Sequence, residues 1–73
     1  MTKSADVRAG QPLTPKEQEA LTFLCKGYQL KEIARHMGAS YFTVNGHLKC
    51  VYIKLDVSNR TECAYRAGKE GLA

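Results

Sequence analysis

The chain has 73 residues, which is near the small end of what folds as a single domain. It contains no run of 18 apolar residues and no apolar leader, so neither a membrane span nor a secretory signal is expected. The net charge is +4, and the three cysteines (Cys25, Cys50 and Cys63) are widely spaced. An odd, scattered set argues against a disulfide framework and favours a reducing cytoplasm.

The first helix is expected to begin just after Thr14. Residues 1–12 are polar and small, without periodicity, and are expected to be a flexible tail or linker before a domain at 13–73. Thr14, Pro15 and Glu17 supply a capping hydroxyl, a proline at the first helical position and a glutamate three residues after the cap. The apolar stripe that follows consists of Ala20, Leu21, Leu24 and Cys25, and Gly27 is a natural stop.

Two further helices are expected at 30–37 and 41–55. Apolar residues recur at helical spacing in both, at Leu30, Ile33, Ala34 and Met37, and then at Val44, Leu48, Val51 and Leu55. Between them, Gly38 can take the left-handed conformation that ends a helix, and Ser40 can cap the next. A short turn containing glycine between two such helices is the helix-turn-helix pattern, whose second helix enters the major groove of DNA.

A fourth helix is expected after Ser58. Asn59 and Glu62 have the spacing of a second capping box, and the helix should end near Gly71. Cys63, Ala64 and Ala67 lie on one face of it. No strand signal and no internal repeat are present. The sequence therefore predicts an all-α, four-helix bundle with a central helix-turn-helix.

Most of the net charge lies in the central helix pair. Residues 29–55 carry Lys31, Arg35, Lys49 and Lys54 against Glu32 alone, which accounts for +3 of the total. A basic patch on such an element suits a polyanion partner. Charge alone is equally compatible with a solvated basic face.

Four segments in order, LTPKEQEALTFL, KEIARHMGAS, TVNGHL and KLDVSNRTE, resemble the LuxR/GerE-type DNA-binding domain, the output module of many bacterial quorum-sensing and response regulators. The resemblance covers Leu13 to Leu72. It implies a cytoplasmic transcription regulator that binds double-stranded DNA as a homodimer, paired through its last helix. Regulation would then come from whatever sets the dimer, which is either an N-terminal receiver or ligand-binding domain or concentration alone.

Carried over residue by residue, the resemblance implies base contacts from Asn45, Gly46 and Lys49. Phosphate contacts would come from Lys31, Thr43, His47 and Lys54, and the dimer interface from Cys63, Ala64 and Ala67. Asn45 stands where the family often has a basic residue, and Gly46 offers no side chain to a base. Direct readout would then rest on Asn45, suited to adenine, and Lys49, suited to guanine.

Tyr41 and Phe42 stand where the family more often shows polar residues. One ring is expected to pack in the core and the other to cover the turn. The alternative is an exposed aromatic that touches a thymine methyl or a partner domain. Ile53 lies off the apolar stripe and is a further candidate for exposure.

Two other functions compete with a DNA-binding regulator. The fold could be repurposed as a protein-interaction module, which the apolar Tyr41, Phe42 and Ile53 mildly favour. A promoter-reading domain of a sigma factor shares the LTPxE and EIA pattern, but the continuation into a fourth helix speaks against it. No enzyme, cofactor or metal site is expected. His47 and Cys50 lack a third orienting group and a pocket, and no metal-binding spacing occurs.

Overall fold

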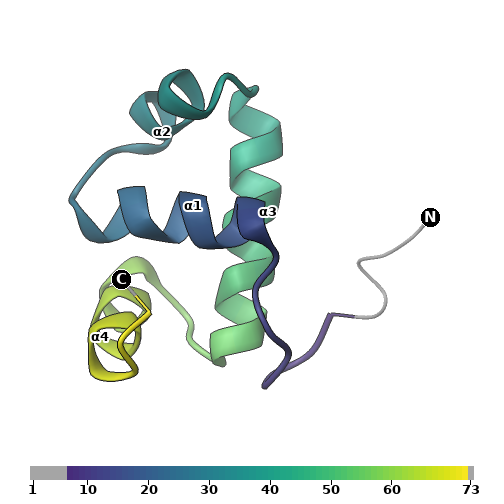
Figure 1. The fold of residues 1–73 in the computed structure, drawn as a ribbon, viewed down its shortest axis with the longest axis vertical. Helices are drawn as coiled ribbons and strands as arrows, with labels where there is room; N and C mark the ends of the chain where they lie inside the picture. Colours follow the sequence, from purple (N-terminus) through teal and green to yellow (C-terminus); the bar gives the residue numbers. More distant parts are fainter. Residues whose placement is uncertain (1–6, 73) are drawn as a thin grey trace.

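The computed structural model describes residues 7–72, which form four helices and no strand (Figure 1). The helices are α1 (Pro15–Cys25), α2 (Leu30–Met37), α3 (Tyr41–Leu55) and α4 (Arg60–Lys69). The all-α prediction is confirmed for these residues. No helix among them is both long and apolar enough to cross a membrane.

Helix α1 begins with the capping box that its sequence predicts. The Thr14 hydroxyl accepts a hydrogen bond from the Glu17 N–H at 3.2 Å, and the Glu17 carboxylate accepts one from the Thr14 N–H at 3.1 Å. These two bonds satisfy donors that a helix N-terminus otherwise leaves without partners. Just past the end of α1, Gly27 has a φ of 93°, a left-handed conformation that favours glycine.

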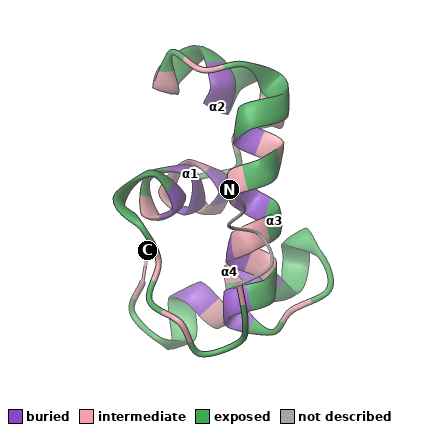
Figure 2. Ribbon diagram, turned by 90° about the vertical axis from the view of Figure 1, so that its right-hand side faces the viewer, coloured by how far each residue is buried: buried purple, intermediate pink, exposed green. Residues whose placement is uncertain are grey.

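Helix α1 contacts each of the other three helices. The longest helix, α3, runs across α1 at one end of it, while α2 and α4 lie on opposite sides of α1 (Figure 1). Buried residues recur along each helix between exposed ones (Figure 2). The core is almost wholly aliphatic and consists of Ala20, Leu21, Leu24, Ile33, Ala34, Val44, Leu48, Val51, Leu55, Cys63 and Ala67.

A small aromatic cluster joins the end of α1 to α2. The His36 ring stacks on Phe23 at 5.2 Å between centroids and lies 5.0 Å from Tyr28, which in turn stacks on Phe23 at 5.4 Å. His36 remains exposed, as expected for a surface residue of α2. The cluster helps to fix the orientation of α2 against α1.

Helix α4 begins with a variant of the expected capping box. The Asn59 side chain accepts from the Glu62 N–H at 2.9 Å, as predicted. The Glu62 carboxylate, however, accepts from the Ser58 N–H at 2.8 Å, one residue before the cap. Arg60 also donates to the carbonyl oxygens of Leu24 and Tyr28. The start of α4 is thereby tied to the end of α1.

The segment before α1 is attached to the domain from residue 7 onward. Its Gly10 N–H donates to the Lys54 carbonyl at 2.9 Å, and the Gln11 N–H donates to the Arg8 carbonyl at 3.3 Å, which forms a turn. Within the tail or linker expected over residues 1–12, residues 7–12 thus form a turn and one backbone hydrogen bond to α3. Residues 1–6 lie outside the described part of the chain, as does Ala73.

Candidate nucleic-acid interface

A tight turn sets α3 against α2. Gly38 ends α2 in the left-handed conformation (φ 64°, ψ 35°), and the N–H of Ala39 donates to the Ala34 carbonyl at 3.0 Å. Two further hydrogen bonds then start α3: Ser40 Oγ accepts from the Thr43 N–H at 3.1 Å and donates to Thr43 Oγ1 at 2.9 Å. The helix-turn-helix predicted from Gly38 and Ser40 is thus present, with both caps formed by the expected residues.

Helix α3 has one buried face and one exposed face. Val44 and Val51 are completely buried, and Leu48 and Leu55 nearly so. Residues at i, i+4 and i+7 share a helix face, and the opposite face carries Phe42, Gly46, Lys49 and Ile53, which we call the outer face of α3. All four are exposed. The outer face is therefore free within this chain to meet a partner.

The three residues expected to read bases all lie outside the core. Gly46 and Lys49 lie on the outer face, and Asn45 is half-buried on its shoulder. A Cβ built on Gly46 would meet nothing within 4 Å, and its φ is not positive. Neither turn geometry nor packing requires a glycine at this position.

Three of the four residues expected to contact phosphate remain accessible. Lys31, in the first turn of α2, and Thr43, in the first turn of α3, are exposed, while His47 is half-buried. Arg35, in the last turn of α2, adds an exposed cation to the same helix pair. Helix α3 itself contains no acidic residue. The surface of the pair is therefore predominantly basic.

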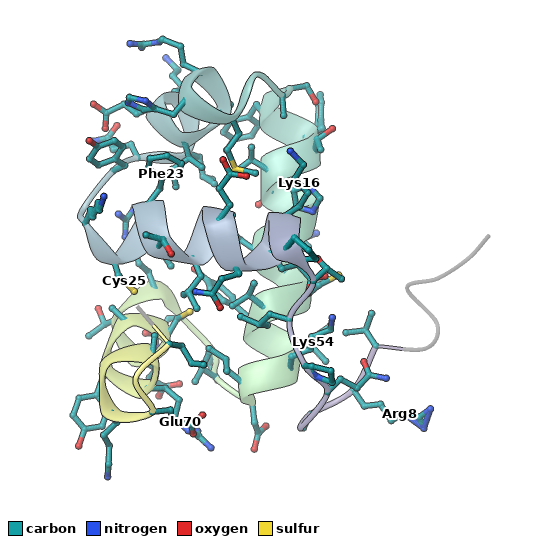
Figure 3. All side chains as sticks on the ribbon, in the orientation of Figure 1. Arg8, Lys16, Phe23, Cys25, Lys54 and Glu70 are labelled. Atoms are coloured by element: carbon teal, nitrogen blue, oxygen red, sulfur yellow. The ribbon has the colours of Figure 1, made fainter. Side chains whose placement is uncertain are left out.

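Lys54 does not fit the expected phosphate contact. Its residue exposure is 9 %, and its ammonium lies 2.6 Å from Glu17 Oε1 and 3.1 Å from the Pro12 carbonyl oxygen. Figure 3 shows the side chain between α3 and the segment that leads into α1. The ammonium is already neutralised and surrounded by protein, so Lys54 joins three parts of the fold and is not available to a phosphate.

The environment of Glu17 keeps its carboxylate charged. Burial by itself would raise the pKa of Glu17, but hydrogen bonds from the Lys54 ammonium and the Thr14 N–H, with smaller help from His47, lower the pKa below its ordinary value. An opposite charge and donors in direct contact favour the ionised form. The Glu17–Lys54 pair is therefore a true ion pair at neutral pH.

Both aromatic residues at the start of α3 are exposed. Tyr41 is 48 % exposed and Phe42 84 %, and their rings meet edge to face at 6.2 Å between centroids. The expectation that one ring packs in the core is wrong, because the buried stripe of α3 begins only at Val44. Ile53 is 48 % exposed, in agreement with its position off the buried stripe.

The face of α4 expected to form a dimer is mostly inside the monomer. Cys63 and Ala67 are completely buried and belong to the core, and only Ala64 is partly accessible. They point inward because α4 packs against α1 and α3. Burial raises the pKa of the Cys63 thiol to about 11, so it stays protonated at neutral pH. The exposed face of α4 carries Thr61, Tyr65 and Gly68 instead.

Sequence reasoning missed the structural role of Arg60, because nothing local indicates that its guanidinium reaches the end of α1. Within residues 7–72, no three potential metal ligands of the His, Cys, Asp or Glu type are grouped together.

Comparison with known proteins places this arrangement in a family. The family described as "Bacterial regulatory proteins, luxR family" matches residues 11–67. The transcriptional regulatory protein DesR of Bacillus subtilis is 35% identical over 60 residues, which cover 82% of this chain and 30% of DesR. The transcriptional regulatory protein UhpA of Salmonella typhimurium is 42% identical over 55 residues, covering 75% of this chain and 28% of UhpA.

A solved structure has the same fold. The response regulator ChrA, from a heme-sensing two-component system, superposes with a TM-score of 0.82 at 31% identity, over 96% of this chain and 35% of ChrA. The chain thus spans about a third of the length of these relatives. Their family is one of DNA-binding regulators rather than enzymes. The chain belongs to the luxR family of bacterial regulatory proteins, as a helix-turn-helix DNA-binding domain of the kind found in transcription regulators.

Proposed function

We propose that this domain binds double-stranded DNA by inserting the outer face of α3 into the major groove, as part of a bacterial transcription regulator. The observation that carries the proposal is the division of α3 into a buried stripe and an exposed face. Gly46 and Lys49 lie on the exposed face, with Asn45 beside it. Lys49 has the donors to pair with guanine, and Asn45 has the donor and acceptor to pair with adenine.

Lys31, Thr43 and His47 are the proposed phosphate contacts. All three lie in the helix-turn-helix and are exposed or half-exposed. A lysine ammonium, a threonine hydroxyl and an imidazole are all groups that bind phosphate oxygens, and such contacts fix the register of a protein on the duplex. Lys54 is left out because its ammonium is held by Glu17 and Pro12.

Two copies are proposed to pair on DNA through the outer surface of α4. Ala64 is partly accessible and can contribute, and the exposed Thr61, Tyr65 and Gly68 take the place of the buried Cys63 and Ala67. Each copy would then place α3 in one of two successive major grooves, about one helical turn apart.

The remaining features of the whole protein are inferred from its relatives. They are about three times as long as this chain, and ChrA is a response regulator. We infer that a receiver or ligand-binding domain on the N-terminal side controls pairing. The domain would act in the cytoplasm, through binding and without catalysis.

An amide-shift titration by NMR with a random-sequence duplex tests DNA binding. Shifts should concentrate at Lys31 and at residues 43–50, and they should fade when salt is raised, because phosphate contacts release counterions. The amide of Lys26, at the far end of α1, serves as the internal control and should hardly move.

The titration also discriminates against the other candidate function. If residues 43–50 stay still at low salt, the proposal is wrong, and the exposed Tyr41, Phe42 and Ile53 become the place to look for a protein partner.

A further inference from the structure

The outer face of α3 is unusually apolar for a surface that would only contact phosphate groups. Of its four residues, only Lys49 carries charge, and Phe42 is 84 % exposed. Phe42 is the second residue of α3, one turn before Gly46 on the same side. A phenylalanine ring left in water forgoes the free energy that its burial would release. The ring is therefore positioned to gain free energy from an apolar partner.

The position of Phe42 limits what this partner can be. In a helix-turn-helix the N-terminal residues of the second helix contact base edges. Lys31 and Arg35 are exposed cations of α2, Lys49 is an exposed cation of the outer face of α3, and α3 carries no acid. This charge distribution suits a polyanion better than an apolar protein surface.

The major groove has one apolar feature, the C5 methyl group of thymine, and phenylalanine is among the side chains that contact it. Gly46, one turn along from Phe42, has no side chain, and the space around its Cβ position is empty within the domain. The space beside the Phe42 ring, at Gly46, is therefore open to a base pair.

We propose that Phe42 is a specificity-determining residue that reads a thymine through its C5 methyl group. This inference rests on the proposed DNA binding by α3. Phe42 and Lys49 are seven residues apart, or about 10 Å along the helix at 1.5 Å per residue. A helix in the major groove is inclined to the duplex axis, so at 3.4 Å per base step the thymine lies at most about three base pairs from the base that Lys49 contacts.

The test begins with selection of a binding site from a randomised duplex pool by the 73-residue chain. Each thymine of the selected site is then replaced by deoxyuridine, which removes only the C5 methyl group. One position per half-site should lose about fourfold in affinity, the value for burying one methyl-sized group.

Variants then assign the methyl contact to a residue. In Phe42→Ala the same deoxyuridine substitution should have no effect, because the two changes remove the same contact. Lys26→Ala is the control, since Lys26 is exposed at the end of α1 and outside the outer face of α3, and it should keep the full sensitivity. Circular dichroism checks that both variants fold.

Two results would overturn the inference alone. One is a selected site that binds tightly but is insensitive to deoxyuridine at every thymine. The other is a sensitivity that persists unchanged in Phe42→Ala. A pool from which no duplex is retained at low salt would instead overturn the proposed DNA binding, and this inference with it.

Discussion

Gly46 is the residue of α3 whose presence the fold explains least. It lies inside a helix, has no positive φ, and a side chain there would point into open space. Glycine inside a helix costs about 1 kcal/mol relative to alanine. The free domain gains nothing from this cost, whereas the proposed binding of α3 to DNA would benefit from it. A bare backbone lets a duplex approach α3 more closely than any side chain would.

Gly46→Ala should therefore separate stability from binding. The free energy of unfolding should rise by up to about 1 kcal/mol in urea denaturation, because alanine restricts the unfolded chain and meets no clash. Affinity for the selected duplex should fall, because the added methyl group lies between the helix and the base pairs. Unchanged affinity in a stabilised variant would show that the duplex does not approach α3 at Gly46.

Lys49→Ala tests direct readout. We expect weaker binding to the selected site and a relaxed preference at one base pair, worth about 1–3 kcal/mol, because the lysine pairs with a base edge. Binding is measured to duplexes that carry each of the four bases at every position. Lys26→Ala is the control, since it removes the same charge from an exposed site at the end of α1. An equal loss on all sequences would make Lys49 a phosphate contact.

Residues whose roles are set locally could be predicted from the sequence. Thr14, Gly38 and Ser40 all form the caps that their neighbours in the chain indicate. Lys54 could not be placed in this way. Its partner Glu17 is 37 positions away, and periodicity identifies the stripe that packs but not a long polar side chain drawn into the same interface.

At the scale of elements, the Glu17–Lys54 pair links the start of α1 to the end of α3. Both side chains are 8 % exposed. A buried ion pair adds little net stability over apolar residues of similar size, but removal of one partner strands a buried charge. The pair therefore affects stability chiefly when one partner is lost and the other charge is left buried and unpaired.

Lys54→Met should lower the free energy of unfolding by about 3–5 kcal/mol, because Glu17 is left charged and buried without its partner. The double variant Glu17→Gln with Lys54→Met should recover most of this loss, since it removes both charges and keeps an acceptor for the Thr14 N–H. Urea denaturation at neutral pH measures both. If the double variant were no more stable than the single one, the loss would come from packing and not from the stranded charge.

The same pair predicts the response to acid. The pKa of Glu17 is lower in the folded domain than its ordinary value of 4.5. Its stabilising effect is therefore fully present above about pH 4.5 and is lost as the pH falls through the lower folded pKa. In Glu17→Gln the stability should depend less steeply on pH in this acidic range. Thermal unfolding between pH 6 and pH 3 makes the comparison, and parallel curves would contradict the assignment.

The order of elements was predictable for a related reason. The apolar periods of α2 and α3 and the glycine between them specify two helices and a turn without reference to the rest of the chain. Which face of α4 packs inward was not assigned correctly, because Cys63 and Ala67 share a face that suits either the core or a second copy. Only the positions of α1 and α3 show whether this face packs in the core or against a second copy.

At the scale of the whole molecule, the helix pair offers fewer cations than its sequence charge of +3 suggests, because Lys54 is paired with Glu17, which lies outside the helix pair. The cations left on the helix pair are Lys31, Arg35 and Lys49. One domain should therefore bind DNA weakly, and tight binding should need two.

Tyr65→Glu should separate pairing from DNA contact. Tyr65 is 68 % exposed, so the fold should tolerate the change, while two copies would bring like charges together across a two-fold axis. Cooperativity between half-sites, typically worth about 5- to 150-fold, should be lost. Binding to a single half-site is the control and should be unchanged. Undiminished cooperativity would place the interface elsewhere.

The contacts around Lys54 also determine how a force on the segment before α1 is transmitted to α3. The segment before α1 lies beside the C-terminal end of α3. There the Gly10 N–H is hydrogen-bonded to the Lys54 carbonyl, and the Lys54 ammonium is hydrogen-bonded to Pro12 and Glu17. A force on the segment before α1 would thus act on both α1 and α3 at Lys54. This point is about 20 Å from the N-terminal end of α3. We expect such a tether to move the domain as one rigid body. An upstream domain would then regulate where the recognition surface is carried, and leave its shape unchanged.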